Sequence, residues 1–163
     1  MTYKKYFFLL VLAVLLMPQA SHAKVEKKRF QHVPPKPGYA TVYLYRTRGQ
    51  PDLRKPKITV DGDPVIHLPN KSWTYFYLGT GSHVVKSKWG FMAAMPEMEA
   101  VVEIQPDRQY FLRFSSSQFS WGFGADTMHT KSSSALREVT EDEAMKDMKK
   151  IKKYAPAEME VVE

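Results

Sequence analysis

Three methionines have the spacing and the chemistry of a soft-metal site. Met92, Met95 and Met98 recur at every third residue in the segment FMAAMPEM, and thioether sulfur is a ligand that suits Cu(I) outside the cytoplasm. Met128 and His129 could add two further donors. Methionine in an irregular connection more often fills gaps in a core, so packing is the preferred interpretation of this segment and copper binding the alternative.

The histidines and serines do not form a catalytic pattern. His32, His67, His83 and His129 fall in different segments, without the close spacing of metal-binding histidines. The serines include no G-x-S-x-G sequence, which is a signature of hydrolase nucleophiles. We therefore expect no catalytic residues, no cofactor and no enzyme activity.

Asp61 and Gly62 are predicted to form a hairpin turn rather than a cation site. Asp61 and Asp63 provide two carboxylates at close spacing, but a calcium loop also needs a later bidentate glutamate, which is absent. In a tight turn Gly62 supplies the positive φ. Gly81 and His83 open a later strand, where His83 can hydrogen-bond to the loop backbone, so these positions are expected to be structural.

Aromatic side chains alternate with aliphatic ones in the segments ATVYLYR and SWTYFYL. Because side chains point to opposite faces of a strand in turn, each segment has an aromatic face. If both faces are exposed, they form a platform that stacks on sugar rings or receives a protein partner. The platform residues are Tyr43, Tyr45, Trp73, Tyr75 and Tyr77, with Tyr39 beside them.

A covered aromatic face is the competing interpretation. A C-terminal helix, through Ala144, Met148 and Ile151, or a proline-rich lead-in would then bury the aromatic side chains as a second small core. We favour this covered arrangement slightly and keep the platform as the binding hypothesis.

A second aromatic group lies in a stretch rich in serine and glycine, residues 115–134. This composition predicts a long loop. Phe119, Trp121 and Phe123 in the loop could contact a membrane or a partner, or they could fold back onto the domain.

The elements that must position these residues are short strands. Period-two alternation and turn residues predict strands over residues 40–46, 58–60, 65–68, 72–78, 83–89, 97–104, 109–115 and 135–139. Thr140 and Glu143 form a capping box, which predicts a helix running to about Lys153. Seven or eight short strands with one C-terminal helix favour a mainly β fold, an antiparallel β-sandwich or partly open barrel similar to transthyretin-like and PEGA-type modules.

The N-terminal residues have the three-part layout of a secretion signal. Lys4 and Lys5 precede an apolar run from Tyr6 to Met17. This run is about 12 residues long, whereas a membrane-spanning helix needs roughly 20. We predict cleavage after Ala23 and export to the periplasm or beyond; an uncleaved N-terminal anchor is the alternative.

The rest of the chain divides into a charged, proline-rich lead-in over residues 24–37, a β-sandwich domain over 38–154 and a loose tail over 155–163. No further segment is apolar enough to span a membrane, although membrane contact is possible. Without Lys4 and Lys5 the formal charge falls from +7 to +5. The basic residues are scattered, so we expect no nucleic-acid binding.

Five segments, in order, carry a family resemblance: PPKPGYATVYLYR, ITVDGDPVIHL, WTYFYLGTGSHVV, VVEIQPDRQYFLRF and ALREVTEDEA. They resemble a bacterial envelope family known only as domain of unknown function 2846 (DUF2846), over roughly residues 34–154. The resemblance implies a small exported β-domain, often a lipoprotein, with no catalytic residues. The matching positions are Asp61, Gly62, Gly81, His83 and Tyr110.

Two departures from that family bear on location and turn chemistry. Thr80-Gly81 stands where the family commonly has Pro-Gly before the histidine. The chain also contains no cysteine, so it has neither a lipid-anchoring cysteine nor disulfides. We therefore expect a form that is not a lipoprotein.

These features predict a non-enzymatic exported envelope module. We expect it to bind an envelope protein or a cell-wall glycan through exposed aromatic side chains. The alternative is a periplasmic copper-binding or stress-related protein that uses Met92, Met95 and Met98.

Overall fold

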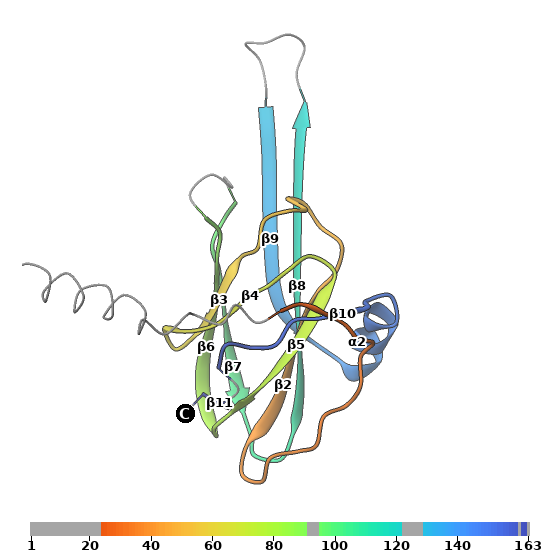
Figure 1. Cartoon of the computed structure of the whole chain (residues 1–163). Coiled ribbons are helices and arrows are strands. Elements are labelled where there is room, and N and C mark those ends of the chain that lie inside the picture. Colours follow the sequence, from red (N-terminus) through yellow and green to blue (C-terminus); the bar gives the residue numbers. More distant parts are fainter. Residues whose placement is uncertain (1–23, 91–94, 122–128, 160, 163) are drawn as a thin grey trace, which may run out of the picture.

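The computed structural model describes residues 24–90, 95–121, 129–159 and 161–162. These described residues form two β-sheets and one helix (Figure 1). The elements are β1 (Glu26–Lys27), β2 (Ala40–Arg46), β3 (Lys57–Val60), β4 (Asp63–His67), β5 (Ser72–Leu78), β6 (Gly81–Lys88), β7 (Met98–Ile104), β8 (Gln109–Trp121), β9 (His129–Val139), α2 (Glu141–Met148), β10 (Lys153–Tyr154) and β11 (Val161–Val162).

The two sheets pack face to face as a sandwich. The larger sheet has the strand order β1-β10-β5-β2-β8-β9, with β11 also paired to β5, and the smaller sheet has the order β4-β3-β6-β7. Among the described residues the sheets do not close into a barrel. The prediction of a mainly β sandwich with one C-terminal helix is confirmed.

Not all strand pairs are antiparallel. Strand β2 pairs antiparallel with β5 but parallel with β8, and the short strands β10 and β11 both pair parallel with β5. Parallel neighbours need a long crossover connection. Here the chain between β2 and β8 supplies that crossover by building the whole smaller sheet and β5.

The main core lies between the sheets. It contains Val42 and Leu44 from β2, Phe76 from β5, and Ile58 and Val85 from the smaller sheet, all without exposed surface. Every residue of β2 is buried, because the opposite face of the larger sheet is covered as well. A second core therefore exists on that face.

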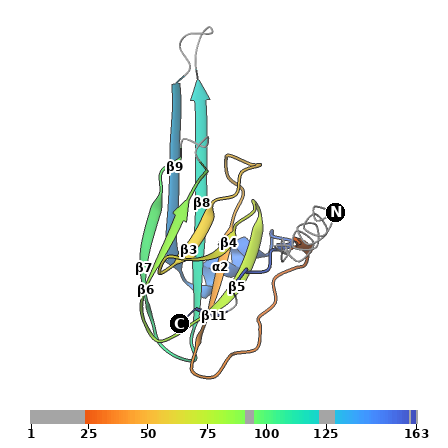
Figure 2. The ribbon, with the colours of Figure 1, turned by 60° about the vertical axis from the view of Figure 1, so that its left-hand side comes forward.

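The long loop predicted over residues 115–134 is wrong. Strands β8 and β9 continue through its described residues, paired from Ser115–Ala135 to Trp121–His129. This hairpin projects well beyond both sheets (Figures 1 and 2). Serine content favoured a loop, but a neighbouring strand satisfies the backbone N–H and C=O groups, and serine hydroxyls pair across the ladder, as between Ser117 and Ser133 at 2.7 Å.

The predicted loose tail is also wrong. Val162 is buried in the main core, β11 extends the sheet beside β5, and the Glu158 N–H donates to the Val65 carbonyl oxygen at 2.7 Å. The tail carries charge, yet its apolar residues find an unpaired strand edge to cover.

The lead-in is part of the domain rather than a tether. Strand β1 pairs with β10, and the Phe30 and Val33 side chains pack against the second core. Because these two apolar residues gain burial, the charged and proline-rich composition around them does not keep the segment away from the sheet.

The helix begins as predicted and ends earlier. The Thr140 side chain accepts a hydrogen bond from the Glu143 N–H at 3.3 Å, as the capping sequence indicated. The helix stops at Met148, and the chain then turns so that Ile151 is buried in the second core. The helix was expected to run to about Lys153.

Residues 1–23, with the predicted cleavage site at Ala23, lie outside the described residues. Within the described part of the chain, no helix combines the length and the apolar character needed to cross a bilayer.

Candidate functional site

The aromatic face of β2 and β5 is covered. Tyr43, Tyr45 and Trp73 have no exposed surface and form the second core with residues of α2 and of the segment after it. The expectation that these three side chains form an exposed platform is therefore wrong, and the competing covered arrangement is confirmed. The physical reason is that α2 follows β9 directly and returns across this face with Ala144 and Met148 turned inward.

The lead-in completes the cover through ring contacts. Phe30 meets Tyr43 and Trp73 edge-on, with centroid distances of 5.1 Å and 5.2 Å, and Phe111 stacks on Tyr43 at 5.1 Å. The Val33 N–H donates to the Tyr43 hydroxyl at 2.9 Å. Burial is the main reason that the pKa of Tyr43 is raised.

The polar ends of the other two buried rings are satisfied within the fold. The Tyr45 hydroxyl donates to Asp147 Oδ2 at 3.2 Å, and Trp73 Nε1–H donates to the Lys28 carbonyl oxygen at 3.2 Å. Burial, and then the negative charge of Asp147, raise the pKa of Tyr45. With their polar atoms occupied, these rings serve packing rather than ligand binding.

Tyr75 and Tyr77 are half-buried and also contact other parts of the fold. Tyr75 stacks on Tyr154 at a centroid distance of 6.1 Å, and the Tyr77 hydroxyl donates to the Pro34 carbonyl oxygen at 2.9 Å. The Lys36 ammonium lies 4.3 Å from the centroid of the half-buried Tyr39 ring. The lead-in thus holds the outer part of the aromatic face as well.

The second predicted aromatic group lies on the projecting hairpin. Phe119 sits on β8 and is 67% exposed. Trp121 ends β8 opposite His129 in the ladder, and Phe123 lies outside the described residues. Of the predicted aromatic site residues whose side chains are described, Phe119 alone is largely exposed.

A buried arginine, which the sequence analysis missed, holds the base of this hairpin. Arg46 has no exposed surface; its guanidinium donates to the carbonyl oxygens of Arg54 at 2.8 Å and Pro51 at 2.9 Å, and lies 5.0 Å from the Trp89 ring centroid. Burial lowers the pKa of Arg46 to about 10, although the charge of Asp52 acts in the opposite direction. The guanidinium is therefore cationic at neutral pH.

Two serines connect that base to the hairpin strands. Arg46 Nη2 donates to Ser116 Oγ at 3.5 Å, and Trp89 Nε1–H donates to Ser134 Oγ at 3.3 Å. Gly49 approaches so closely that an added Cβ would lie 2.3 Å from the Ser116 carbonyl oxygen. In the sequence, the one sign of this buried arginine was its position at the end of an apolar strand, before a loop that contains Pro51 and Pro56.

The methionines lie partly outside the described residues. Met95 and Met98 are partly buried and pack against the main core, in agreement with the packing interpretation. Met92 and Met128 are not among the described residues. Within the described part of the chain, no group of three or more histidine and acidic side chains is arranged to hold a metal ion.

Asp61 and His83 form a close pair that the sequence analysis did not connect. Asp61 Oδ2 accepts from His83 Nδ1 at 2.6 Å, and Asp61 Oδ1 accepts from the Val84 N–H at 2.8 Å. The positive φ of Asp61 and Gly62, 51° and 99°, confirms the predicted turn. A turn aspartate that faces the start of a neighbouring strand could have indicated the pair.

This pair resembles the orienting half of a catalytic triad, in which the second histidine nitrogen must face a nucleophile. In this fold His83 Nε2 instead donates to the Gly79 carbonyl oxygen at 2.9 Å, and His83 is buried. The predicted hydrogen bond to the loop backbone is confirmed.

Electrostatics favour the ionised form of Asp61. Burial, the largest influence, acts to raise the pKa of Asp61, but the Val84 N–H and the hydrogen bond and charge of His83 together outweigh it. The pKa is consequently lower than usual.

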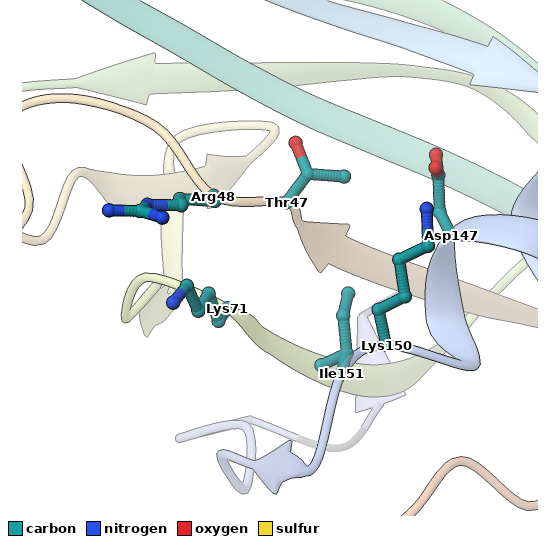
Figure 3. Close-up of a pocket in the computed structure, with 6 residues that line it drawn as sticks. All are labelled: Thr47, Arg48, Lys71, Asp147, Lys150 and Ile151. Atoms are coloured by element: carbon teal, nitrogen blue, oxygen red, sulfur yellow. The ribbon is translucent and has the colours of Figure 1, made fainter.

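A basic hollow lies beside the C-terminal end of β2. It has a volume of ≈ 410 Å³ and lies between the end of β2, the turn before β5 and the end of α2 (Figure 3). Its lining consists of Thr47, Arg48, Lys71, Asp147, Lys150 and Ile151. None of these residues was a predicted site residue.

Comparisons of the chain with protein-family models, with curated proteins and with solved structures found no match. The geometry of the site therefore carries the functional argument.

Proposed function

We propose that this protein is a non-enzymatic exported envelope module that binds another protein through the β8–β9 hairpin. The observation that carries the proposal is the length of that hairpin, whose ladder continues to the Trp121–His129 pair beyond the sandwich. Export rests on the signal-like residues 1–23, and an envelope location also on the resemblance to DUF2846.

The hairpin offers backbone edges for strand addition. Strand β2 accompanies β8 only as far as the Arg46–Phe114 pair, and β9 is the last strand in the order of its sheet. Past that point each described hairpin strand is paired only with the other. Unpaired strand edges are a common site for a partner to add a strand.

The outer part of the hairpin ladder is polar. It pairs Ser117 with Ser133 and Gln118 with Ser132, so this pairing brings together few apolar groups. A two-stranded ribbon is marginally stable by itself. Binding of a partner to Phe119 and to the adjacent strand edge would explain why the hairpin extends beyond the sandwich.

A protein partner fits this surface better than a cell-wall glycan. A sugar-stacking platform needs several exposed aromatic rings; Tyr43, Tyr45 and Trp73 are buried, and on the hairpin Phe119 is the one described ring that is largely exposed. A glycan therefore becomes the outcome to exclude in the test.

The test uses the purified full chain as bait in envelope extract, with recovered proteins identified by mass spectrometry. One variant replaces residues 118–132 by Asn-Gly, a two-residue turn that preserves the Ser117–Ser133 register. We expect the variant to remain folded and to lose the specific partner. A peptidoglycan pull-down runs beside it.

A second test variant, Phe119→Ser, is compared with Leu53→Ser as its matched control. Both remove a large exposed apolar side chain, since Leu53 is 95% exposed in the loop after β2. The proposal expects only Phe119→Ser to weaken capture. Equal recovery by the shortened hairpin, or retention on peptidoglycan alone, would contradict it.

A further inference from the structure

We propose that the basic hollow binds a phosphate group carried by a ligand. This inference is separate from the hairpin proposal, because the hollow is formed by other segments. It rests on three exposed cationic side chains that the fold brings together: Arg48, Lys71 and Lys150.

The three cations come from distant parts of the chain. Arg48 follows β2, Lys71 lies in the turn before β5, and Lys150 follows α2. In Figure 3 the Arg48 and Lys71 side chains lie beside each other on one side of the hollow, with their charged ends pointing away from Lys150, which lies on the other side and extends toward Asp147. An anion that enters the hollow would be attracted by all three side chains, which are exposed and free to turn toward it.

Arg48, Lys71 and Lys150 form no ion pair with an acidic side chain of the described residues. Asp147 is the one acid among the lining residues, and its Oδ2 already lies 3.3 Å from Arg113 Nη1 and accepts from the Tyr45 hydroxyl. The described lining is therefore cationic.

Backbone contacts hold Arg48 and Lys71 next to each other. The Asn70 side chain accepts from the Gly49 N–H at 3.2 Å and donates to the Gly49 carbonyl oxygen at 3.1 Å. These two hydrogen bonds connect Gly49, the residue after Arg48, to Asn70, the residue before Lys71. Lys71 itself has a left-handed backbone conformation, with a φ of 53°.

The segment that carries Lys150 is fixed as well. The Lys150 N–H donates to the Asp147 carbonyl oxygen at 3.1 Å, and the Ile151 N–H donates to the Met148 carbonyl oxygen at 3.0 Å. Ile151 is buried in the second core. The backbone positions of all three cations are thus set before any ligand arrives, which reduces the entropy lost on binding.

Phosphate suits this set of groups. An arginine fork can bind two phosphate oxygens at once, a lysine adds a point charge, and the Thr47 hydroxyl can donate a further hydrogen bond. The hollow, at ≈ 410 Å³, has room for a phosphate group and for part of the molecule that carries it. The bearer is either a soluble phosphate ester or a lipid headgroup.

The test measures binding of inorganic phosphate to the purified full chain by amide chemical shifts at an ionic strength of about 0.1 M, where the Debye length is about 10 Å. We expect saturable shifts at Thr47, Arg48, Lys71 and Lys150. The combined variant Arg48→Gln, Lys71→Asn and Lys150→Gln should raise the Kd by roughly tenfold or more, the combined effect of exposed ion pairs. Asparagine is used at residue 71 because it tolerates a positive φ.

A charge-matched control separates the hollow from general attraction. Arg108→Gln, Lys57→Gln and Lys131→Gln remove the same charge from exposed positions that do not line the hollow. The control should change the Kd by less than about twofold, since exposed charges beyond a Debye length are screened. No saturable shifts, or equal weakening by both combined variants, would overturn the proposal.

Vesicles distinguish the two bearers of phosphate. Phosphatidylglycerol vesicles that bind the protein more tightly than phosphatidylcholine vesicles, with loss in the hollow variant alone, indicate a lipid headgroup. Binding of inorganic phosphate without vesicle binding indicates a soluble ester. The hairpin variant should bind phosphate normally, so the two proposals fail independently.

Discussion

Two aromatic regions of this molecule have opposite environments although both lie on strands of the same sheet. Tyr43 and Trp73 are fully buried beneath α2 and the lead-in, whereas Phe119 is largely exposed on the hairpin. The strands differ in what passes over them. Segments at both ends of the domain return across β2 and β5, and the described chain sends none across the outer hairpin (Figure 2). Aromatic content by itself therefore does not indicate which strand faces are exposed.

The largest effect should come from removing a ring of the covered face. Trp73→Ala is expected to cost about 3–5 kcal/mol of unfolding free energy, because it leaves a cavity among Phe30, Tyr43 and Tyr154. Urea denaturation followed by circular dichroism measures the change. A cost below about 1 kcal/mol would mean that the lead-in and helix do not cover this face.

The helix that provides the cover can be tested by a pair of substitutions. Met148→Ala should destabilise the fold by about 2–4 kcal/mol, since the Met148 side chain is buried in the second core. Lys146→Ala, on the exposed side of the same helix, should change stability by less than about 0.5 kcal/mol. Similar costs for both would show that α2 does not pack as described.

Asp61, in the turn between β3 and β4, should make the stability of the sandwich depend on pH. The unfolded pKa is about 3.9 and the folded pKa is lower. The carboxylate therefore stabilises the fold above the unfolded value, and this stability disappears as pH falls through the folded pKa. Because Asp61 is partly exposed, we expect Asp61→Asn to cost only about 1 kcal/mol at pH 7.

Urea denaturation at pH 7 and at pH 3 measures this difference, which should shrink at the lower pH. Asp63→Asn is the control, since Asp63 is an exposed carboxylate in the same hairpin. A cost for Asp61→Asn that stays constant with pH would argue against the charged pair with His83.

The smallest effect on stability should be at Phe119. Phe119→Ala is expected to change the unfolding free energy by less than about 0.5 kcal/mol, because the side chain is mostly exposed. The same substitution should weaken partner capture. A large loss of stability would place Phe119 with the covered aromatics and remove the basis for the comparison.

Local pattern was sufficient for most of the sandwich. Alternation in ATVYLYR and SWTYFYL predicted β2 and β5, Asp61-Gly62 predicted the hairpin turn between β3 and β4, and Thr140 predicted the start of α2. These features depend on residues within a few positions of one another, and short-range pattern reports such interactions well.

Pattern was insufficient where a distant segment supplies the partner. Ser115 to Trp121 has the composition of a loop, yet β9 pairs with it along the whole described length. Val162 lies in a charged tail, yet the free side of β5 and the main core receive it. Neither contact has a signal in the residues nearby.

The candidate sites divide in the same way. Phe119 was predicted as a candidate from its aromatic type and its segment, although the loop around it was wrong. Arg46 as the base of the hairpin, and the hollow of Arg48, Lys71 and Lys150, depend on segments far apart in the chain. Charge by itself could not show which of the scattered cations converge.

By itself the sequence determined the mainly β class, the turns, the start of the helix and an aromatic face on β2 and β5. The tertiary structure alone decided that this face is covered, that the serine-rich segment is a projecting ribbon, and that three cations share a hollow. The physical reason is range. Periodicity and turn chemistry act between near neighbours, whereas burial depends on which distant segment returns to cover a surface, and that is a property of the whole fold.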